Sequence, residues 1–287
     1  MQTIALRLAI IGCGTMGEAI VSGLLRAQAI APEQLIVTTR RQEVAETLSR
    51  RYGIHATTDN VAACSGADAV LFALKPKTVP KVADQADMRE ALAGKPTISI
   101  AAGVKLDDLR AWLPQSLVIR AMPNTPCLIG EGTTVLSRSA DVSDQAIALA
   151  TRIFETVGLC VELQERHMDA VTGLCGSGPA FVYVMLESMA DGGVMMGLPR
   201  EVALQIAAQV FQGAARMVLQ TGLHPAALKD QVTTPAGCTI AGILMMEDGR
   251  IRSVLARTVQ EAARVAGGLG DPDELERLAR LAGDKPS

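Results

Sequence analysis

A glycine-rich turn near the start of the chain limits what this sequence can fold into more than any other feature. Gly12, Gly14 and Gly17 form a G-x-G-x-x-G pattern, which alone is weak because glycines gather in many loops. Here it follows a compact apolar run, Arg7–Ile11, and opens a stretch, Thr15–Gln28, with apolar residues at helical spacing. In this context the glycines allow a tight turn, close approach of a pyrophosphate and close helix–strand packing. The sequence therefore predicts a dinucleotide-binding βαβ unit.

Short apolar runs alternate with helical stretches over residues 1–163. Continuous β-rich runs separated by helices favour a parallel sheet covered on both faces. We therefore predict a Rossmann-type, doubly wound α/β domain over residues 1–163. Beyond the first strand, its expected strands are Leu35–Thr39, Ala69–Leu74, Thr97–Ala101 and Val118–Met122, and the stretch Gln42–Tyr52 is an expected helix.

The character of the chain changes after this region, and residues 164–287 are predicted to form an all-α domain. No convincing strand pattern follows His167. The expected helices are Ser177–Met196, Arg200–Thr221, Pro225–Val232, Thr239–Asp248 and Ile251–Leu269. A module this rich in Ala, Leu and Met exposes more apolar surface than a monomer tolerates, so two copies are expected to pair. The last residues, Gly283–Ser287, are expected to be disordered.

The composition argues against several other classes of protein. The formal net charge is −3, and the scattered basic residues favour no nucleic-acid surface. No stretch approaches the ~18 uninterrupted apolar residues of a membrane span, and the start lacks a basic segment followed by a long apolar one. We therefore expect a cytoplasmic protein. The 6 cysteines form no CxxC pair and the chain has 3 histidines, so no metal site is expected.

The end of the second expected strand indicates which dinucleotide is bound. NAD-binding folds usually place Asp or Glu there, on the ribose 2′-hydroxyl. This chain has Thr38–Arg41 instead, with no acid before Glu43. An acid would repel a 2′-phosphate, whereas Arg40 or Arg41 can pair with it. The pattern favours NADP(H) over NAD(H); the alternative is that both arginines are solvated charges at a helix start.

A lysine stands where the expected strand Ala69–Leu74 ends. Lys75 is followed by Pro76, which stops the strand at the carboxyl edge of the sheet. Ligands of such folds bind at that edge. We therefore expect Lys75 to lie near the cofactor rather than to be an idle surface lysine.

A second candidate site lies in the helical half, between two expected helices. Pro235 and Gly237 make a sharp turn, and Thr239 stands at or near the start of the next helix. The free N–H groups at such a helix start favour a carboxylate, and the hydroxyls of Thr234 and Thr239 add donors. The alternative is that Thr239 only caps its helix.

Several segments spread over most of the chain together resemble pyrroline-5-carboxylate reductases. The most specific of them is Leu228–Thr239 (LKDQVTTPAGCT). The resemblance implies an N-terminal Rossmann-type domain and a helical domain that interlocks two subunits, with dimers able to build a larger ring. It implies NADPH-dependent reduction of 1-pyrroline-5-carboxylate to L-proline, the last step of proline biosynthesis, with NAD also accepted. The other segments are Ile11–Gly17 (IGCGTMG), Ala73–Pro76 (ALKP), Ser99–Val104 (SIAAGV), Arg120–Pro126 (RAMPNTP), Asp169–Ala180 (DAVTGLCGSGPA) and Asp191–Pro199 (DGGVMMGLP).

The resemblance also implies which residues form the sites. The implied substrate contacts are Glu165, Thr234, Gly237, Cys238 and Thr239, with Thr239 as the catalytic residue. The implied cofactor contacts are Gly12, Cys13, Gly14, Thr15, Met16, Gly17, Thr39, Arg40, Asn60, Ala73, Leu74, Lys75, Pro76, Ile100, Ala101 and Ala102. The chain departs from the family where Thr233 and Thr234 replace two frequent serines, Ala236 replaces glycine, Cys175 replaces serine and Gln231 replaces asparagine.

The helical half contains few side chains that could act as a general acid, and an imine substrate needs little help from one. A carbonyl reductase commonly needs a positioned acid to protonate the developing alkoxide, whereas an imine can already carry its proton. The lysines and histidines of residues 164–287 are Lys229, Lys285, His167 and His224. Glu165 is expected to balance an iminium charge.

Two other functions remain open from the sequence. A β-hydroxyacid dehydrogenase shares the two-domain plan, and Lys229 would be its lysine facing the nicotinamide. A dinucleotide sensor without catalysis would need no carboxylate site in its second domain, so the loop of residues 234–239 disfavours it.

Overall fold

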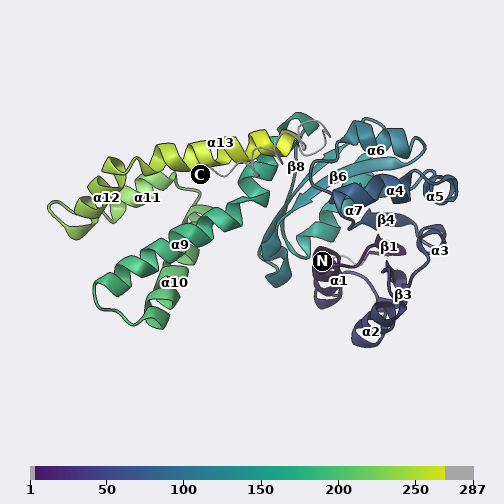
Figure 1. The fold of residues 1–287 in the computed structure, drawn as a ribbon, viewed down its shortest axis with the longest axis horizontal. Coiled ribbons are helices and arrows are strands. Elements are labelled where there is room, and N and C mark those ends of the chain that lie inside the picture. The colour runs from purple at the N-terminus through teal and green to yellow at the C-terminus, as the bar shows by residue number, and fades with distance from the viewer. Residues whose placement is uncertain (1–3, 269–287) are drawn as a thin grey trace, which may run out of the picture. The chain divides into compact units, whose positions relative to one another are not determined.

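The computed structural model describes residues 4–268 (Figure 1). Two compact units share these residues: one comprises 4–177 with 261–268, and the other comprises 178–260. The expected domain boundary between residues 163 and 164 lies inside the first unit and stays a prediction. The expected disorder of Gly283–Ser287 concerns residues outside the described part of the chain.

The first unit is built on an eight-stranded sheet in the order β3-β2-β1-β4-β5-β6-β7-β8. The strands β1 to β6 are all parallel to one another in this sheet. Their order is that of dinucleotide-binding Rossmann folds, so the predicted fold class is confirmed. The strands are β1 (Leu8–Ile11), β2 (Leu35–Thr38), β3 (His55–Thr57), β4 (Ala69–Phe72), β5 (Pro96–Ser99), β6 (Leu117–Pro123), β7 (Gly132–Arg138) and β8 (Gly158–Glu162).

The expected parallel arrangement holds for β1 to β6 but not for β7, which runs antiparallel to β6. Only residues 124–131 connect these two strands, and they form a single 3-10 turn, Thr125–Ile129. A parallel connection needs a crossover of a dozen or more residues, so this link forces the chain to turn back. Strand β8 then pairs parallel to β7, and the sheet is mixed.

Helices cover both faces of the sheet, as the doubly wound pattern predicts (Figure 1). Neighbouring residues of β1 point to opposite faces: Ile10 packs in the core under α1, α2 and α7, and Ile11 packs in the core under α3 to α6. The helices are α1 (Thr15–Arg26), α2 (Gln42–Tyr52), α3 (Asn60–Ser65), α4 (Val79–Ala83), α5 (Ala86–Leu92), α6 (Leu106–Trp112), α7 (Asp144–Glu155) and α8 (Met168–Val171).

Helices make up the rest of the described chain, which confirms the all-α expectation for this half. A five-residue π-helical segment, Thr172–Gly176, separates α8 from α9. The following helices are α9 (Gly178–Met195), α10 (Arg200–Thr221), α11 (Pro225–Gln231), α12 (Cys238–Asp248) and α13 (Ile251–Gly268). The residues of α13 are divided between the two units.

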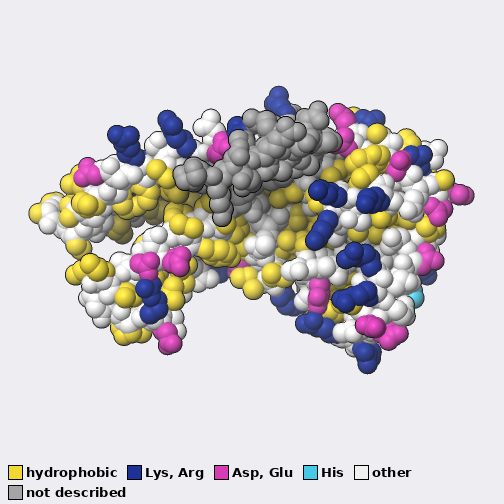
Figure 2. Space-filling view, viewed as in Figure 1, with side chains coloured by type: hydrophobic (Ala, Val, Ile, Leu, Met, Phe, Trp, Pro, Cys, Tyr) yellow, Lys and Arg dark blue, Asp and Glu magenta, His cyan; other side chains and the backbone are white. Residues whose placement is uncertain are grey.

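The second unit buries little of its own apolar surface. Its buried cluster consists of Ala190, Ala203 and Ala207, whereas Met195 and Met196 are 87% and 84% exposed. Figure 2 shows hydrophobic side chains spread over these helices. Two segments, residues 165–195 and 200–221, are long and apolar enough by composition to cross a membrane, and only 11% of each apolar window is buried. A second copy of the chain would cover such a surface.

We therefore expect no stable folded monomer at micromolar concentration. Separating two copies would return the apolar faces of α9 and α10 to water, and α9 and α10 have too small a buried cluster to compensate. Light scattering coupled to gel filtration checks this directly. A well-folded species of 30.1 kDa would contradict it.

Candidate dinucleotide and substrate sites

The turn between β1 and α1 lies tightly against the segment that follows β4. Gly12 has a φ of 88°, and a Cβ there would lie 2.5 Å from Leu74 Cδ2 and 3.1 Å from the Ala73 carbonyl oxygen. A Cβ on Gly17 would lie 2.9 Å from the Gly12 carbonyl oxygen. Both positions therefore require glycine, as the pattern predicts.

The same turn has the geometry of a pyrophosphate cradle. The Gly12 N–H donates to Thr38 Oγ1 (3.1 Å) and the Cys13 N–H donates to the Thr38 carbonyl (2.8 Å), so β2 holds the start of the turn. Apart from Gly14 and its chain neighbours, no atom of the described chain lies within 4 Å of where a Gly14 Cβ would stand. The first-turn N–H groups of α1, from Thr15 onward, precede the regular helix bonds and are available to an anion.

A cavity of about 390 Å³ opens beside this turn, at the carboxyl ends of β1, β2 and β4. Nine of the predicted cofactor residues line it: Gly12, Cys13, Gly14, Thr39, Arg40, Asn60, Ala73, Leu74 and Lys75. The other predicted contacts, Thr15, Met16, Gly17, Pro76, Ile100, Ala101 and Ala102, do not line it and stay predictions. Sequence reasoning missed Thr38, Thr58, Thr78 and Val82, which also line it. Thr58 follows the unpredicted strand β3, which explains that omission.

The charges around the cavity suit a phosphorylated ribose. Arg40 and Lys75 line it, and its described lining includes no acid. Arg40 forms no ion pair within residues 4–268, whereas Arg41 precedes α2 and does not line the cavity. The nearby acid Glu18, in the first turn of α1, accepts from Arg51 Nη1 (2.6 Å) and from the Tyr52 hydroxyl (2.8 Å).

The cysteine inside the dinucleotide turn carries no charge. Burial, and secondly the carboxylate of Glu18, raise the pKa of the Cys13 thiol to about 12. The thiol therefore stays protonated at neutral pH and adds no negative charge where a pyrophosphate would lie.

The predicted substrate loop of the second unit leads into α12. Gly237 is the N-cap, and its N–H donates to the Thr234 carbonyl (3.2 Å). A Cβ on Gly237 would meet Thr234 Oγ1, so a larger residue there would have to displace the Thr234 hydroxyl. Cys238 begins the helix, Thr239 is its second residue, and no side chain of the described chain caps it. Thr239 is therefore not the N-cap of this helix.

The structure gives Glu165 a partner that the sequence analysis did not foresee. Its Oε1 accepts from Arg120 Nη1 (2.7 Å) and from the Leu106 N–H (3.1 Å). The Arg120 side chain is 3% exposed, so the charge expected to balance an iminium is already paired with a buried cation. Glu165 belongs to the first unit and Thr239 to the second. The sequence did contain a sign of this ion pair, because Arg120 is a charged residue inside an apolar run that was predicted to be a strand.

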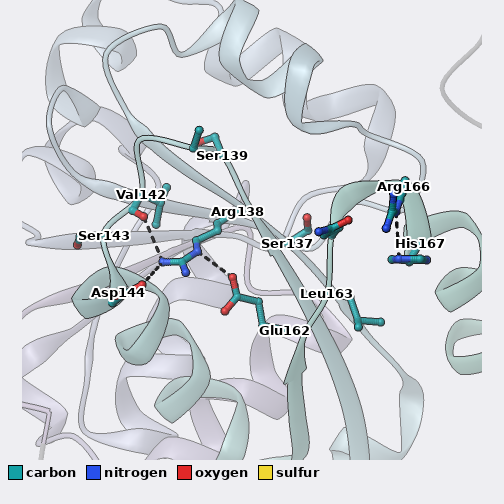
Figure 3. Close-up of a pocket in the computed structure, with 12 residues that line it drawn as sticks. Ser137, Arg138, Ser139, Val142, Ser143, Asp144, Glu162, Leu163, Arg166 and His167 are labelled. Atoms are coloured by element: carbon teal, nitrogen blue, oxygen red, sulfur yellow. Dashed lines mark hydrogen bonds and ion pairs between the residues drawn. The ribbon is translucent and has the colours of Figure 1, made fainter.

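A larger cavity of about 840 Å³ lies at another place in the first unit and contains no predicted site residue. Arg138 at the end of β7 binds Asp144 (2.7 Å) and Glu162 (2.8 Å) there (Figure 3). Because β7 and β8 run opposite to β6, their carboxyl ends lie at the sheet edge opposite the dinucleotide cavity. This cavity is not part of the candidate site.

Comparison with known proteins agrees with the two-part geometry. Residues 7–103 match the family described as NADP oxidoreductase coenzyme F420-dependent, and residues 165–269 match the family described as pyrroline-5-carboxylate reductase dimerisation. A dinucleotide-binding sheet followed by a helical dimerisation module defines a two-domain nicotinamide-dependent oxidoreductase.

Full-length relatives define the family. The chain is 40% identical over 270 residues to the pyrroline-5-carboxylate reductase of Synechocystis sp., covering 93% of this chain and 99% of the relative. It is 38% identical over 277 residues to that of Schizosaccharomyces pombe, covering 91% and 98%. The chain belongs to the pyrroline-5-carboxylate reductase family.

Solved structures resemble this fold over nearly their whole length. The pyrroline-5-carboxylate reductase of Coxiella burnetii has a TM-score of 0.88 at 30% identity, covering 93% of this chain and 100% of that one. The pyrroline carboxylate reductase of Plasmodium falciparum, solved with NADP bound, has a TM-score of 0.83 at 27% identity, covering 94% and 100%.

The loop before α12 contains a strained residue that yields a stability prediction. Ala236 has a φ of 52°, a left-handed conformation that costs an L-residue about 1–2 kcal/mol. Ala236→Gly should remove this strain, offset in part by greater freedom of the unfolded chain, for a gain of about 0.5–1 kcal/mol. Thermal melting checks it against Ala241→Gly inside α12, which should destabilise by a similar amount. Equal destabilisation by both changes would show that Ala236 is unstrained.

Proposed function

We propose that this chain reduces 1-pyrroline-5-carboxylate to L-proline with NADPH, as the last step of proline biosynthesis. The observation that carries the proposal is full-length membership of the reductase family, across both the dinucleotide and the helical parts. A hydride adds to the ring carbon of the C=N bond, the nitrogen keeps its proton and becomes an amine, and NADPH becomes NADP⁺. The direct experiment is to measure NADPH oxidation with 1-pyrroline-5-carboxylate.

The cofactor proposal is supported by the cavity beside the glycine turn. The α1 amides hold the pyrophosphate, and Arg40 pairs with the 2′-phosphate. NADH lacks that phosphate and is the weaker cofactor. Lys75 adds a second positive charge at the same edge.

The substrate proposal is supported by the loop that starts α12. Thr234, Gly237, Cys238 and Thr239 bind the carboxylate through hydroxyls and helix-start N–H groups. Thr239 contacts the substrate and is the proposed catalytic residue in that sense. Glu165 contributes as a hydrogen-bond acceptor, since Arg120 already pairs with its charge.

The histidines and the lysine in the described part of the helical half have structural partners instead. His224 Nδ1 accepts from the Ala226 N–H (3.2 Å) and caps α11, and His167 Nε2 accepts from Arg166 Nε (3.3 Å). Lys229 pairs with Asp230. This pairing disfavours a β-hydroxyacid dehydrogenase, which would need a free lysine; 3-hydroxyisobutyrate with NADP tests that alternative. A sensor without catalysis would turn over neither substrate.

The assembly proposal follows the matched dimerisation family. Two copies interlock through their helical domains, which begin at residue 164, and dimers build a larger ring. We place the protein in the cytoplasm with a small imino acid as its partner, and with no nucleic-acid or membrane partner.

Cofactor choice gives the first functional prediction. Arg40→Asp should erase or reverse the preference for NADPH over NADH, because a charge-assisted bond worth about 1.5–3 kcal/mol is lost and a repulsion is added. The measurement is kcat/KM with each cofactor. Arg41→Asp is the matched control, since Arg41 does not line the cavity and should leave the preference nearly unchanged. A wild-type protein that clearly favours NADH would refute the role of Arg40.

Carboxylate binding gives the second prediction. Thr239→Ala should remove one bond to the carboxylate, worth about 1.5–3 kcal/mol, and lower kcat/KM about ten- to two-hundredfold. On 1-pyrroline, which lacks the carboxylate, the variant and the wild type should barely differ. The effects on kcat/KM of removing the Thr239 hydroxyl and of removing the substrate carboxylate should therefore not be additive, and this non-additivity is the diagnostic result.

A matched control for that experiment is Thr233→Ala. The Thr233 hydroxyl donates to the Lys229 carbonyl (2.7 Å) at the end of α11, so its loss should affect both substrates alike. If Thr239→Ala also impaired both substrates alike, the carboxylate would have to bind elsewhere.

A further inference from the structure

Arg120 is a charged residue where the fold expects an apolar one. It lies inside β6, between β5 and β7, with its side chain 3% exposed. A buried charge is expensive, and its pairing with an acid often does no more than offset the desolvation. Two apolar neighbours on the same strand, Val118 and Met122, show what ordinary packing on that face requires. Stability alone therefore gives little reason for an arginine here.

One oxygen atom joins three separate segments around this arginine. Glu165 Oε1 accepts from Arg120 Nη1 in β6 and from the Leu106 N–H at the start of α6. Glu165 itself lies just after β8, in the turn Glu165–His167. The carboxylate thus ties the beginning of α6 to the middle of the sheet.

The geometry of the Arg120–Glu165 pair is not that of the strongest possible ion pair. Arg120 Nη2 and Glu165 Oε2 are buried and have no hydrogen-bond partner in residues 4–268. A two-point arginine–carboxylate contact would satisfy both atoms. Here a single oxygen instead serves both the guanidinium and the backbone of α6, at the expense of two unsatisfied polar atoms.

The tied segment is the connection proposed to contact the cofactor. Ser99 ends β5 and is the register partner of Arg120, and α6 begins at Leu106. Residues 100–105 include the proposed contacts Ile100–Ala102. The strand residue before this segment is therefore paired with Arg120, and the residue after it is bonded to the carboxylate that Arg120 holds. In this strand order the pyrophosphate lies over β1, so the β5 end faces the nicotinamide half of a dinucleotide.

We propose that Arg120 is a positioning residue for hydride transfer: through Glu165 it fixes the β5–α6 connection against the nicotinamide half of the cofactor. This inference rests on the proposed cofactor contacts at Ile100–Ala102. It assigns Glu165 a role as an oriented acceptor and not as the counter-ion of the substrate. A displaced connection would misplace the nicotinamide relative to the imine, and small displacements of a reacting group cost large factors in rate.

The first experiment compares Arg120→Ala with Arg138→Ala. Arg138 is a matched control because it is an ion-paired arginine on the neighbouring strand β7, next to the register partner of Arg120. Its partners are Asp144, Glu162 and the Val142 carbonyl, none of which belongs to the β5–α6 connection. Arg120→Ala should weaken NADPH binding and lower kcat about ten- to a hundredfold. With NADPH deuterated at the transferred position, its isotope effect on kcat should rise, because hydride transfer becomes the slow step. Arg138→Ala should change none of these. Identical behaviour of the two variants would overturn the proposal.

The second experiment removes Glu165 in two ways, and it decides the matter if Arg120→Ala fails to fold. Both Glu165→Gln and Glu165→Ala remove the negative charge that faces Arg120, but Gln retains an oxygen that can accept hydrogen bonds from Arg120 and from the Leu106 N–H. Glu165→Gln should therefore keep most of the NADPH affinity that Glu165→Ala loses. Equal losses in both variants would mean that the charge of Glu165 matters and not its position, and the proposal would fail.

The readout separates this inference from the proposed function. NADPH binding measured by calorimetry on the full-length dimer requires no imine. If the wild type failed to reduce 1-pyrroline-5-carboxylate, the proposed reaction would fall. The comparison of NADPH affinities among the Arg120, Glu165 and Arg138 variants would still decide whether the guanidinium positions the cofactor site.

Discussion

The close approach of the glycine turn to the end of β4 is the constraint on which the first unit depends. Gly12 leaves no room for a side chain against Ala73 and Leu74, and Gly17 leaves none against the turn itself. These contacts bring α1 down onto the sheet and aim its first N–H groups along the carboxyl edge. The cavity forms beside this contact, between the ends of β1, β2 and β4. Helix packing and anion binding thus have the same geometric origin.

The second unit, residues 178–260, differs from the first because it buries few of its own apolar side chains. Its apolar residues cover α9, α10 and α12 on several sides, while its buried cluster is made of three alanines. Such helices satisfy the length and composition of membrane spans, which illustrates that apolar content alone does not tell a lipid contact from a protein contact. The match to a dimerisation family identifies the missing neighbour as a second subunit.

The sequence predicted those parts of the fold whose physics is local. The turn at Gly12, the strands β1 and β4, and the helix starts after prolines follow from short-range rules. Two of the three missed strands have weak local patterns: β3 is three residues long and starts with an exposed histidine, and β8 is largely exposed. The third, β7, is seven residues long and mostly buried, and its pattern was overlooked. The antiparallel direction of β7 follows from the short connection between β6 and β7. That length can be read from the sequence only after both strands have been recognised. The pairing of Arg120 with Glu165 spans 45 residues, and no local pattern indicates such a contact.

The neutral thiol of Cys13 has a consequence for how the protein responds to oxidative conditions. Alkylation and oxidation proceed through the thiolate, and burial raises the pKa of this thiol to about 12, so little of it is ionised at neutral pH. A cysteine can therefore stand in the phosphate-binding turn and still react slowly with oxidants and alkylating agents.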